Sequence, residues 1–257
     1  MSFAPVIDAL GIPPSALVEQ RVPKKLLLEH GAPTAADKRQ IQDGIEEIIW
    51  VAALKPTNIG VPAFEDVVRQ YLEIAVLTVE LRPAAKPTRL IELIHRAIPY
   101  PLILATGQEG AVSLSLAHKR RSQGETGKVV IEDVRQVTLD SDTPSTQEAA
   151  FLASLAISRL PSWDLFTVYD GMAARLAALE ASRITGAYSP TDSPESAASV
   201  RAGLDQYAQL QRDLDLLRAR AVKEKQINRR VDLNLEIQRM ESVLGAIRNS
   251  LQEGAPS

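Results

Sequence analysis

The first half of the chain mixes strand-like and helix-like patterns of apolar residues. Residues 71–81 (YLEIAVLTVEL) are β-branched and apolar on both faces, which is typical of a central strand that is covered on each side. Residues 37–54 carry isoleucines at helical spacing, so they predict one long helix that begins near Asp37 and ends at Lys55-Pro56. A second amphipathic helix is predicted over residues 88–98, with Thr88 as its cap.

The pattern then changes to short strands and afterwards to helices. Residues 102–105 and 111–118 alternate around two glycines and predict a hairpin, and residues 129–139 supply one more strand, or two. From residue 145 the pattern is helical, with one helix through Leu160 and another that starts near Pro161. The fold class that we predict is α+β, a small mixed sheet covered by helices and followed by an all-α C-terminal segment.

Composition shifts divide the chain into segments. The polar stretch SPTDSPESAAS, with two prolines, is the clearest linker. The predicted segments are an N-terminal extension (1–19), an α+β body (20–140), a helical pair packed on it (141–188), the linker (189–199) and heptad helices (200–252).

The C-terminal segment has a heptad pattern of apolar residues on two stretches. We call this pattern the seam, and it is represented by Leu214, Leu217, Leu233, Ile237, Met240 and Leu244. The two stretches lose phase across residues 222–228. Either a single long helix or an antiparallel hairpin folded at 223–228 fits this pattern, and the lack of Gly or Pro there favours the single helix. So narrow a stripe needs a partner, either a second copy or another protein.

The amino-acid composition excludes several classes of functional site. The chain has 257 residues and no cysteine, which excludes disulfides, thiolate metal sites and thiol nucleophiles. It has no apolar run of membrane-spanning length and no secretory signal pattern, so we expect a cytoplasmic protein without a membrane partner. The chain has a net charge of −3, but residues 201–252 alone carry +3. This difference indicates an anionic partner for the C-terminal segment.

The common catalytic motifs are absent from the sequence. The three histidines form no zinc motif, and the glycines match neither a Walker loop nor a dinucleotide-binding fingerprint. No G-x-S-x-G elbow is present. We therefore predict no cofactor and no metal, and a protein without catalytic activity.

One enzymatic alternative stays open. Restriction-type nucleases place a carboxylate on one strand and Glu-x-Lys on the next, and a helix and another strand follow. Here Glu80-Leu81-Arg82 ends the predicted strand, with Asp66 or Glu73 as the second acid. Arginine is a poor substitute for the lysine because it cannot deprotonate.

Two basic clusters are candidates for contact with a partner or a nucleic acid. Lys119, Arg120 and Arg121 follow the second hairpin strand, and Lys223, Lys225, Arg229 and Arg230 lie in the C-terminal segment. Few aromatic residues accompany them, so stacking on bases is not expected.

Four stretches together resemble a known family. They are Arg21-Val22-Pro23-Lys24-Lys25, the segment from Ile48-Ile49-Trp50 to Leu54-Lys55-Pro56-Thr57-Asn58-Ile59, Ala97-Ile98-Pro99-Tyr100-Pro101, and the segment from Lys223 to Asn234. In this order they resemble a bacterial family catalogued as a domain of unknown function, number 4391 of that series, over residues 20–250.

The resemblance implies a setting near DNA. Proteins of that family look like accessory proteins encoded beside helicases and DNA methyltransferases in phage-defence or restriction-like loci. It therefore implies a non-catalytic assembly subunit that docks such a helicase or methyltransferase and contacts DNA, or that associates with itself through its C-terminal helices. It supplies no catalytic residues.

Overall fold

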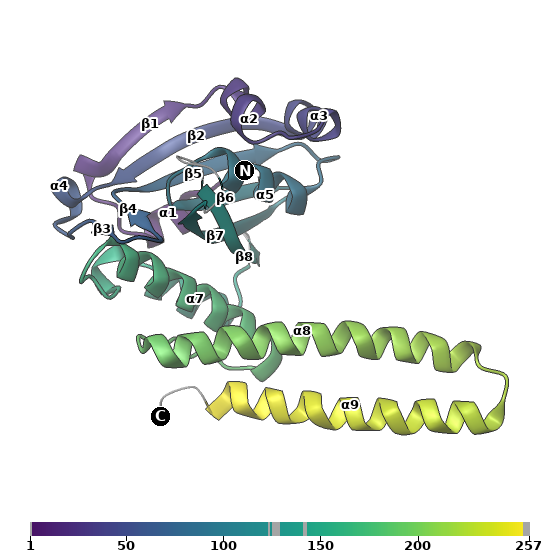
Figure 1. The fold of residues 1–257 in the computed structure, drawn as a ribbon. Coiled ribbons are helices and arrows are strands. Elements are labelled where there is room, and N and C mark those ends of the chain that lie inside the picture. The colour runs from purple at the N-terminus through teal and green to yellow at the C-terminus, as the bar shows by residue number, and fades with distance from the viewer. Residues whose placement is uncertain (1, 123, 125–128, 141–142, 254–257) are drawn as a thin grey trace. The chain divides into compact units, whose positions relative to one another are not determined.

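The computed structural model describes residues 2–122, 124, 129–140 and 143–253 (Figure 1). Contacts divide the chain into two compact units, Met1–Leu176 and Ala177–Ser257. Among the described residues, no helix combines the length and the apolar character that crossing a bilayer requires.

The first unit is built on a six-stranded mixed sheet. Its order is β1-β2-β5-β6-β7-β8, and β5 and β6 are the only parallel pair in that sheet as described. The bounds are Leu17–Arg21 for β1, Ile45–Leu54 for β2, Ile74–Leu81 for β5, Leu102–Gln108 for β6, Ala111–Arg121 for β7 and Val129–Asp140 for β8. A separate small hairpin pairs β3 (Phe64–Glu65) with β4 (Gln70–Tyr71).

Helices cover both faces of this sheet. One face carries α2 (Lys24–His30), α3 (Ala35–Gly44) and α5 (Pro87–Ala97), whose apolar side chains pack on alternate residues of β5. On the other face, the Tyr169 hydroxyl from α7 (Leu165–Thr185) donates to the carbonyl of Leu102, at 2.9 Å. In β5 every residue except Glu80 is buried, which confirms the predicted central strand.

Short helices complete the first unit. They are α1 (Ala4–Ala9), α4 (Pro56–Ile59), α6 (Thr146–Ser154) and the 3₁₀ turns Pro14–Ala16 and Ile157–Arg159.

The helix predicted over residues 37–54 is wrong in its second half. The helix α3 ends at Gly44, and the chain continues directly into β2. A Cβ on Gly44 would lie 2.8 Å from a methyl carbon of Leu90, so α5 packs tightly on this junction. The β-branched residues that follow Gly44 favour the extended conformation. The caps also differ, because Thr34 rather than Asp37 caps α3, and α5 begins at Pro87 without a cap from Thr88.

The residues predicted as an N-terminal extension belong to the core. Val6 and Leu10 are fully buried, and the carbonyl of Leu10 accepts from the Ile157 amide at 3.0 Å. The helix predicted to run through Leu160 ends at Ser154, and a 3₁₀ turn follows it.

The second unit is a helical hairpin with one more helical segment at its base. The helices α8 (Pro194–Lys223) and α9 (Ile227–Glu253) lie side by side and run in opposite directions (Figure 1). The single long helix favoured by the sequence is therefore wrong. Instead of Gly or Pro, the turn uses Glu224, which is extended and whose carboxylate accepts from the Gln226 amide at 2.8 Å. The predicted linker is also shorter, because Pro194 begins α8.

The seam joins the two helices of the hairpin. Leu214, Leu217 and Leu244 are buried, while Leu233, Ile237 and Met240 are half-buried. At the base, Ala177 and Ala181 from the end of α7 pack against three further seam residues, Leu204, Ile247 and Leu251. The predicted heptads are thus used within one chain.

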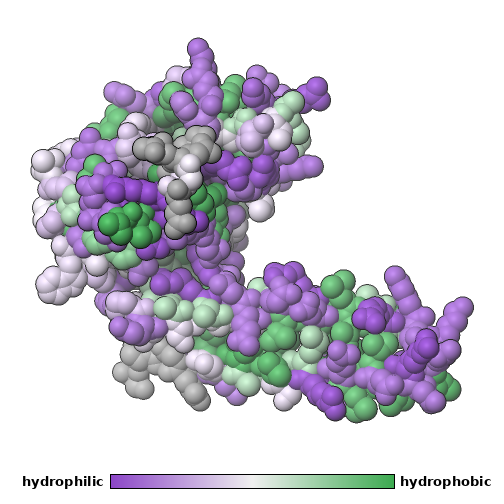
Figure 2. All heavy atoms as spheres, viewed as in Figure 1, coloured by the Kyte–Doolittle hydropathy of each residue, from purple (hydrophilic) through white to green (hydrophobic). Residues whose placement is uncertain are grey.

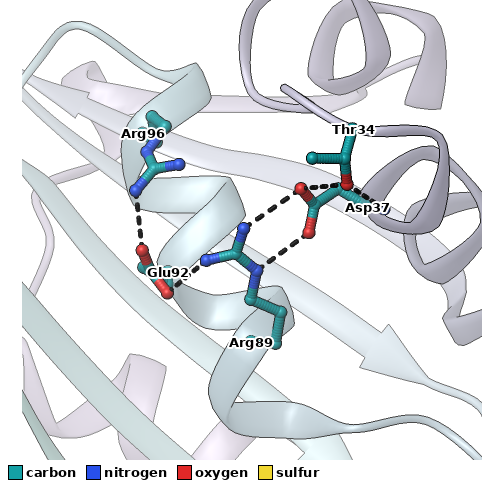
Figure 3. A network of polar contacts seen from close by, with 5 residues as sticks. All are labelled: Thr34, Asp37, Arg89, Glu92 and Arg96. Carbon is teal, nitrogen blue, oxygen red and sulfur yellow. Dashed lines mark hydrogen bonds and ion pairs between the residues drawn. The ribbon is translucent and has the colours of Figure 1, made fainter.

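A partly buried ion pair ties α3 to α5 (Figure 3). The guanidinium of Arg89 donates to both oxygens of the Asp37 carboxylate, at 2.9 and 3.1 Å, and to Glu92 at 2.7 Å. Arg96 donates to the other oxygen of Glu92. Asp37 also accepts from the Thr34 hydroxyl at 2.7 Å. These bonds, above all that from Arg89, lower the pKa of Asp37 to about 2.

We expect Arg89→Leu to lower the melting temperature by several degrees at pH 7, because it leaves the carboxylate of Asp37 without its charged partner. The folded pKa of Asp37 lies below its ordinary value of 3.8, so this stabilisation is complete above about pH 4 and is lost as the pH falls toward 2. Thermal melts from pH 7 to pH 2 check this. The control is Arg96→Leu, which removes only an exposed ion pair. Equal effects of the two substitutions would contradict the prediction.

Candidate binding site

A cavity of about 390 Å³ opens on the face of the sheet that α2 and α5 cover. Its floor is the β5 pair Ala75 and Leu77, and the indole of Trp50 from β2 forms one wall. The lining is mostly apolar, and its polar side-chain groups come from Gln20, Arg21 and His30 together with the Tyr100 hydroxyl and the Trp50 indole N–H. The remaining lining residues are Val22, Pro23, Leu26, Leu27 and residues 97–100.

The mouth of the cavity carries apolar side chains exposed to solvent. Leu26 is 48% exposed and Tyr100 is 43% exposed. The indole nitrogen of Trp50 donates to the carbonyl of Ala52 at 2.8 Å, which fixes the orientation of the ring. The site therefore has a rigid apolar wall next to a solvent-exposed mouth. This arrangement suits a large apolar side chain of a ligand.

Two lysines hold the walls of the cavity in place. The ammonium of Lys119 donates to the carbonyls of Ile98 and Tyr100, in the loop that follows α5. The ammonium of Lys24 donates to the carbonyls of Gln42, at 3.3 Å, and Ile45 at the junction of α3 and β2. Burial lowers the pKa of Lys119 to about 7, so its charged and neutral forms are both populated near neutral pH.

His95 lies on the buried side of α5, facing β7. Its Nε2 is 3.0 Å from the hydroxyl of Ser115, and the side chain is fully buried. Burial, assisted by Lys119, lowers the pKa of His95 to about 3, so the ring is neutral at physiological pH. This histidine is therefore a neutral core residue between α5 and β7.

The three cations of the first basic cluster lie in different surroundings. Lys119 is buried on the same face of β7 as Ser115, the residue that contacts His95 of α5. Arg120 lies 4.0 Å from Glu132, and Arg121 pairs with Glu65. All three cations thus have partners within the chain.

The second basic cluster surrounds the turn of the hairpin. Lys223, Lys225, Arg229 and Arg230 are all exposed, as the interruption of the seam predicts. Within the described part of the chain, none of these four side chains pairs with an acid. This turn therefore presents uncompensated positive charge.

The candidate nuclease acids do not come together. Asp66 accepts from the amides of Val68 and Arg69 in the β3–β4 turn, and Glu73 pairs with Lys55 at 3.1 Å. Glu73 directly precedes β5 and Glu80 lies near its end, so the two are about 23 Å apart at the rise of a strand. Among the described residues, no group of three or more His, Asp or Glu side chains could hold a metal ion.

The structure places other charged groups beside Glu80. Glu47 of β2 is its direct neighbour across the strands, and Glu46 pairs with Arg82 at 2.5 Å. Sequence reasoning missed Glu46 and Glu47, because it assigned both to a helix. A correct start for β2 would have indicated them.

Three stretches from distant parts of the chain meet at the cavity. They contribute Arg21 to Pro23, Trp50, and residues 97–100. The sequence profile described as Domain of unknown function (DUF4391) matches residues 10–244, which is most of the chain. The chain belongs to this family. No curated protein and no solved structure gives a significant match.

Membership in this family confirms the resemblance seen in the sequence. The stretches that carry the resemblance also draw attention to the cavity. Of the four stretches that carry the resemblance, three line the cavity and the fourth forms the basic turn of the hairpin. Sequence reasoning did not find the cavity, although the positions of the four stretches were a signal for it.

Proposed function

We propose that this DUF4391 protein is a non-catalytic assembly subunit that receives an apolar side chain of a partner protein in the cavity beside Trp50. The observation that carries the proposal is the convergence of three family-like stretches on one apolar cavity. Binding energy at protein interfaces concentrates where a large side chain fills such a pocket and water is excluded around it. Leu26 and Tyr100 at the mouth would complete that contact.

The partner that we propose is a helicase or DNA methyltransferase of the same bacterial locus. This part rests on the kind of locus in which proteins of this family look to be encoded, which implies phage defence or restriction-modification and a cytoplasmic setting. The experiment is capture of partners by the tagged full-length protein in its native host, with cavity variants beside the native sequence.

The basic turn of the hairpin supports contact with nucleic acid as a second part of this role. Its four exposed cations could neutralise phosphates. We expect the variant with glutamine at Lys223, Lys225, Arg229 and Arg230 to bind duplex DNA at least tenfold more weakly at low salt. The slope of log affinity against log salt should also become shallower, by about 0.9 for each phosphate that the variant no longer neutralises.

Fluorescence anisotropy with a labelled duplex at several salt concentrations measures both effects. The matched control replaces Arg120 and Arg121 by glutamine, because those cations already pair with acids. Equal losses in the two variants, or no affinity in the native protein, would contradict this part of the proposal.

A metal-dependent nuclease centred on Glu80 is the second candidate. Two observations favour it, the β5–α5–β6 crossover and the position of Glu47 opposite Glu80. Against it, Arg82 pairs with Glu46 and cannot act as the lysine does.

We expect the pure protein to leave plasmid DNA intact in the presence of Mg²⁺ or Mn²⁺. The measurement is gel analysis after prolonged incubation, with Glu80→Ala and Glu47→Ala purified in the same way. Cleavage that disappears in both variants would promote the nuclease over the assembly subunit. Cleavage that persists in them would indicate a contaminating enzyme.

A further inference from the structure

One exposed face of α9 carries no charged residue between Ile227 and Gln252. At 100° per residue, this face lies roughly opposite the seam, so α9 has two uncharged faces and only one of them packs on α8. We call it the outer face. Its main residues are Ile227, Val231, Asn234, Leu235, Gln238, Ser242, Gly245 and Asn249.

The outer face is open along its length. Ile227 is 68% exposed, Val231 51% and Leu235 50%, and they follow one another at intervals of four residues. A Cβ built on Gly245 would meet nothing within 4 Å. Figure 2 shows apolar residues exposed along the hairpin. Large aliphatic side chains in a row on a helix are the usual mark of a helix-packing surface.

We infer that the outer face binds the outer face of a second copy, with the two α9 helices antiparallel. The first argument is charge. Asp232 and Arg239 lie along one edge of the face, and Arg230 and Glu241 lie along the other. In both pairs, the acid and the base are equally distant from a point between residues 235 and 236. One two-fold axis at that point therefore places every one of these acids opposite a base of the second copy.

The second argument is side-chain size. The same axis sets Val231 against the level of Gln238 and Ser242 in the second copy. It also sets Ile227 against the level of Ser242 and Gly245. The aliphatic half of the face thus meets the half with small and uncharged residues, while Leu235 lies beside its own counterpart. A surface built to bind an unrelated protein would not need this internal symmetry in both charge and size.

Asp232 and Arg239 are the residues that report on this interface. Neither has an ion-pair partner among the described residues, whereas Glu241 already pairs with Arg218 at 2.7 Å. Each is exposed, so its replacement should leave the fold unchanged. Asp232→Arg would set two like-charged pairs across the axis, and adding Arg239→Asp would restore two opposite-charged pairs.

Sedimentation velocity of the full-length protein from 1 to 200 μM tests the inference. We expect a reversible dimer, at least tenfold weaker dimerisation in Asp232→Arg and in Val231→Glu, and recovery in the Asp232→Arg/Arg239→Asp double variant. Melting curves should be unchanged at concentrations where all variants are monomers. A native protein that stays monomeric throughout would overturn the inference and leave the face to a different partner. A dimer that Asp232→Arg does not weaken would overturn it as well.

Cross-linking tests the antiparallel arrangement separately. The chain has no cysteine, so single cysteines introduced on the outer face report only on that face. We expect Leu235→Cys to form a disulfide-linked dimer under mild oxidation. Asn249→Cys should not, because antiparallel pairing places the two copies of that residue about 40 Å apart. Efficient linkage through both positions would indicate parallel helices and contradict the proposed axis.

Discussion

Val76→Asp will prevent the first unit from folding cooperatively. Val76 is fully buried at the centre of β5, with helices over both faces of the sheet. A carboxylate without a partner in that position costs several kcal/mol, out of a total stability that is usually about 5–15 kcal/mol. Circular dichroism and thermal melting of the purified variant measure the outcome.

The matched control is Val67→Asp, the same substitution at an 89%-exposed position in the β3–β4 turn. It should melt within about a degree of the native protein. If Val76→Asp were soluble and melted cooperatively near the native temperature, β5 would not be the central strand.

Leu26→Asp will reduce capture of the native partner at least tenfold while leaving the fold intact. Leu26 is 48% exposed at the mouth of the cavity, so the carboxylate remains solvated in the free protein. In the complex it would be desolvated against an apolar side chain, and a tenfold loss corresponds to about 1.4 kcal/mol. Quantitative mass spectrometry of proteins bound to the tagged chain measures the loss.

Leu72→Asp is the control for this substitution. Leu72 is 49% exposed, nearly the same as Leu26, but it does not line the cavity. We expect Leu72→Asp to capture the partner as well as the native protein does. Equal capture by Leu26→Asp and the native protein would remove the cavity from the interface.

The strands β5 to β8 could be predicted from the sequence because they carry period-two or continuous apolar patterns, whereas no strand was predicted at β1. The strand β2 could not, because isoleucines at positions 41, 45, 48 and 49 fit a helical stripe as well as a strand. The boundary lies at Gly44, where α5 packs so closely that a Cβ would be 2.8 Å from a methyl carbon of Leu90.

The hairpin shows a second limit of sequence patterns. Its seam was predictable residue by residue, whereas its turn was not, since the chain reverses at Glu224 without Gly or Pro. The reversal depends on a side-chain hydrogen bond to the Gln226 amide and on helix pairing, and neither leaves a mark in composition.

The candidate site was predictable only in part. The exposed cations of the hairpin turn follow from the break in the heptads. The burial of Lys119 depends on the loop after α5, where the carbonyls of Ile98 and Tyr100 accept from its ammonium, and no local sequence pattern indicates that contact. The cavity joins Arg21, Trp50 and Tyr100, which are far apart in the sequence, and so it required the fold.

The central claim is that a partner protein occupies this cavity. Its most direct test is site-specific photo-cross-linking in the native host, with a photoreactive phenylalanine derivative in place of Tyr100, which lies at the mouth. The same derivative at Leu72 is the control. We predict a cross-linked adduct with one protein, a helicase or methyltransferase of the locus, from position 100 and none from position 72. Failure of position 100 to form any adduct, under conditions where the tagged protein still captures its partner, would contradict the claim.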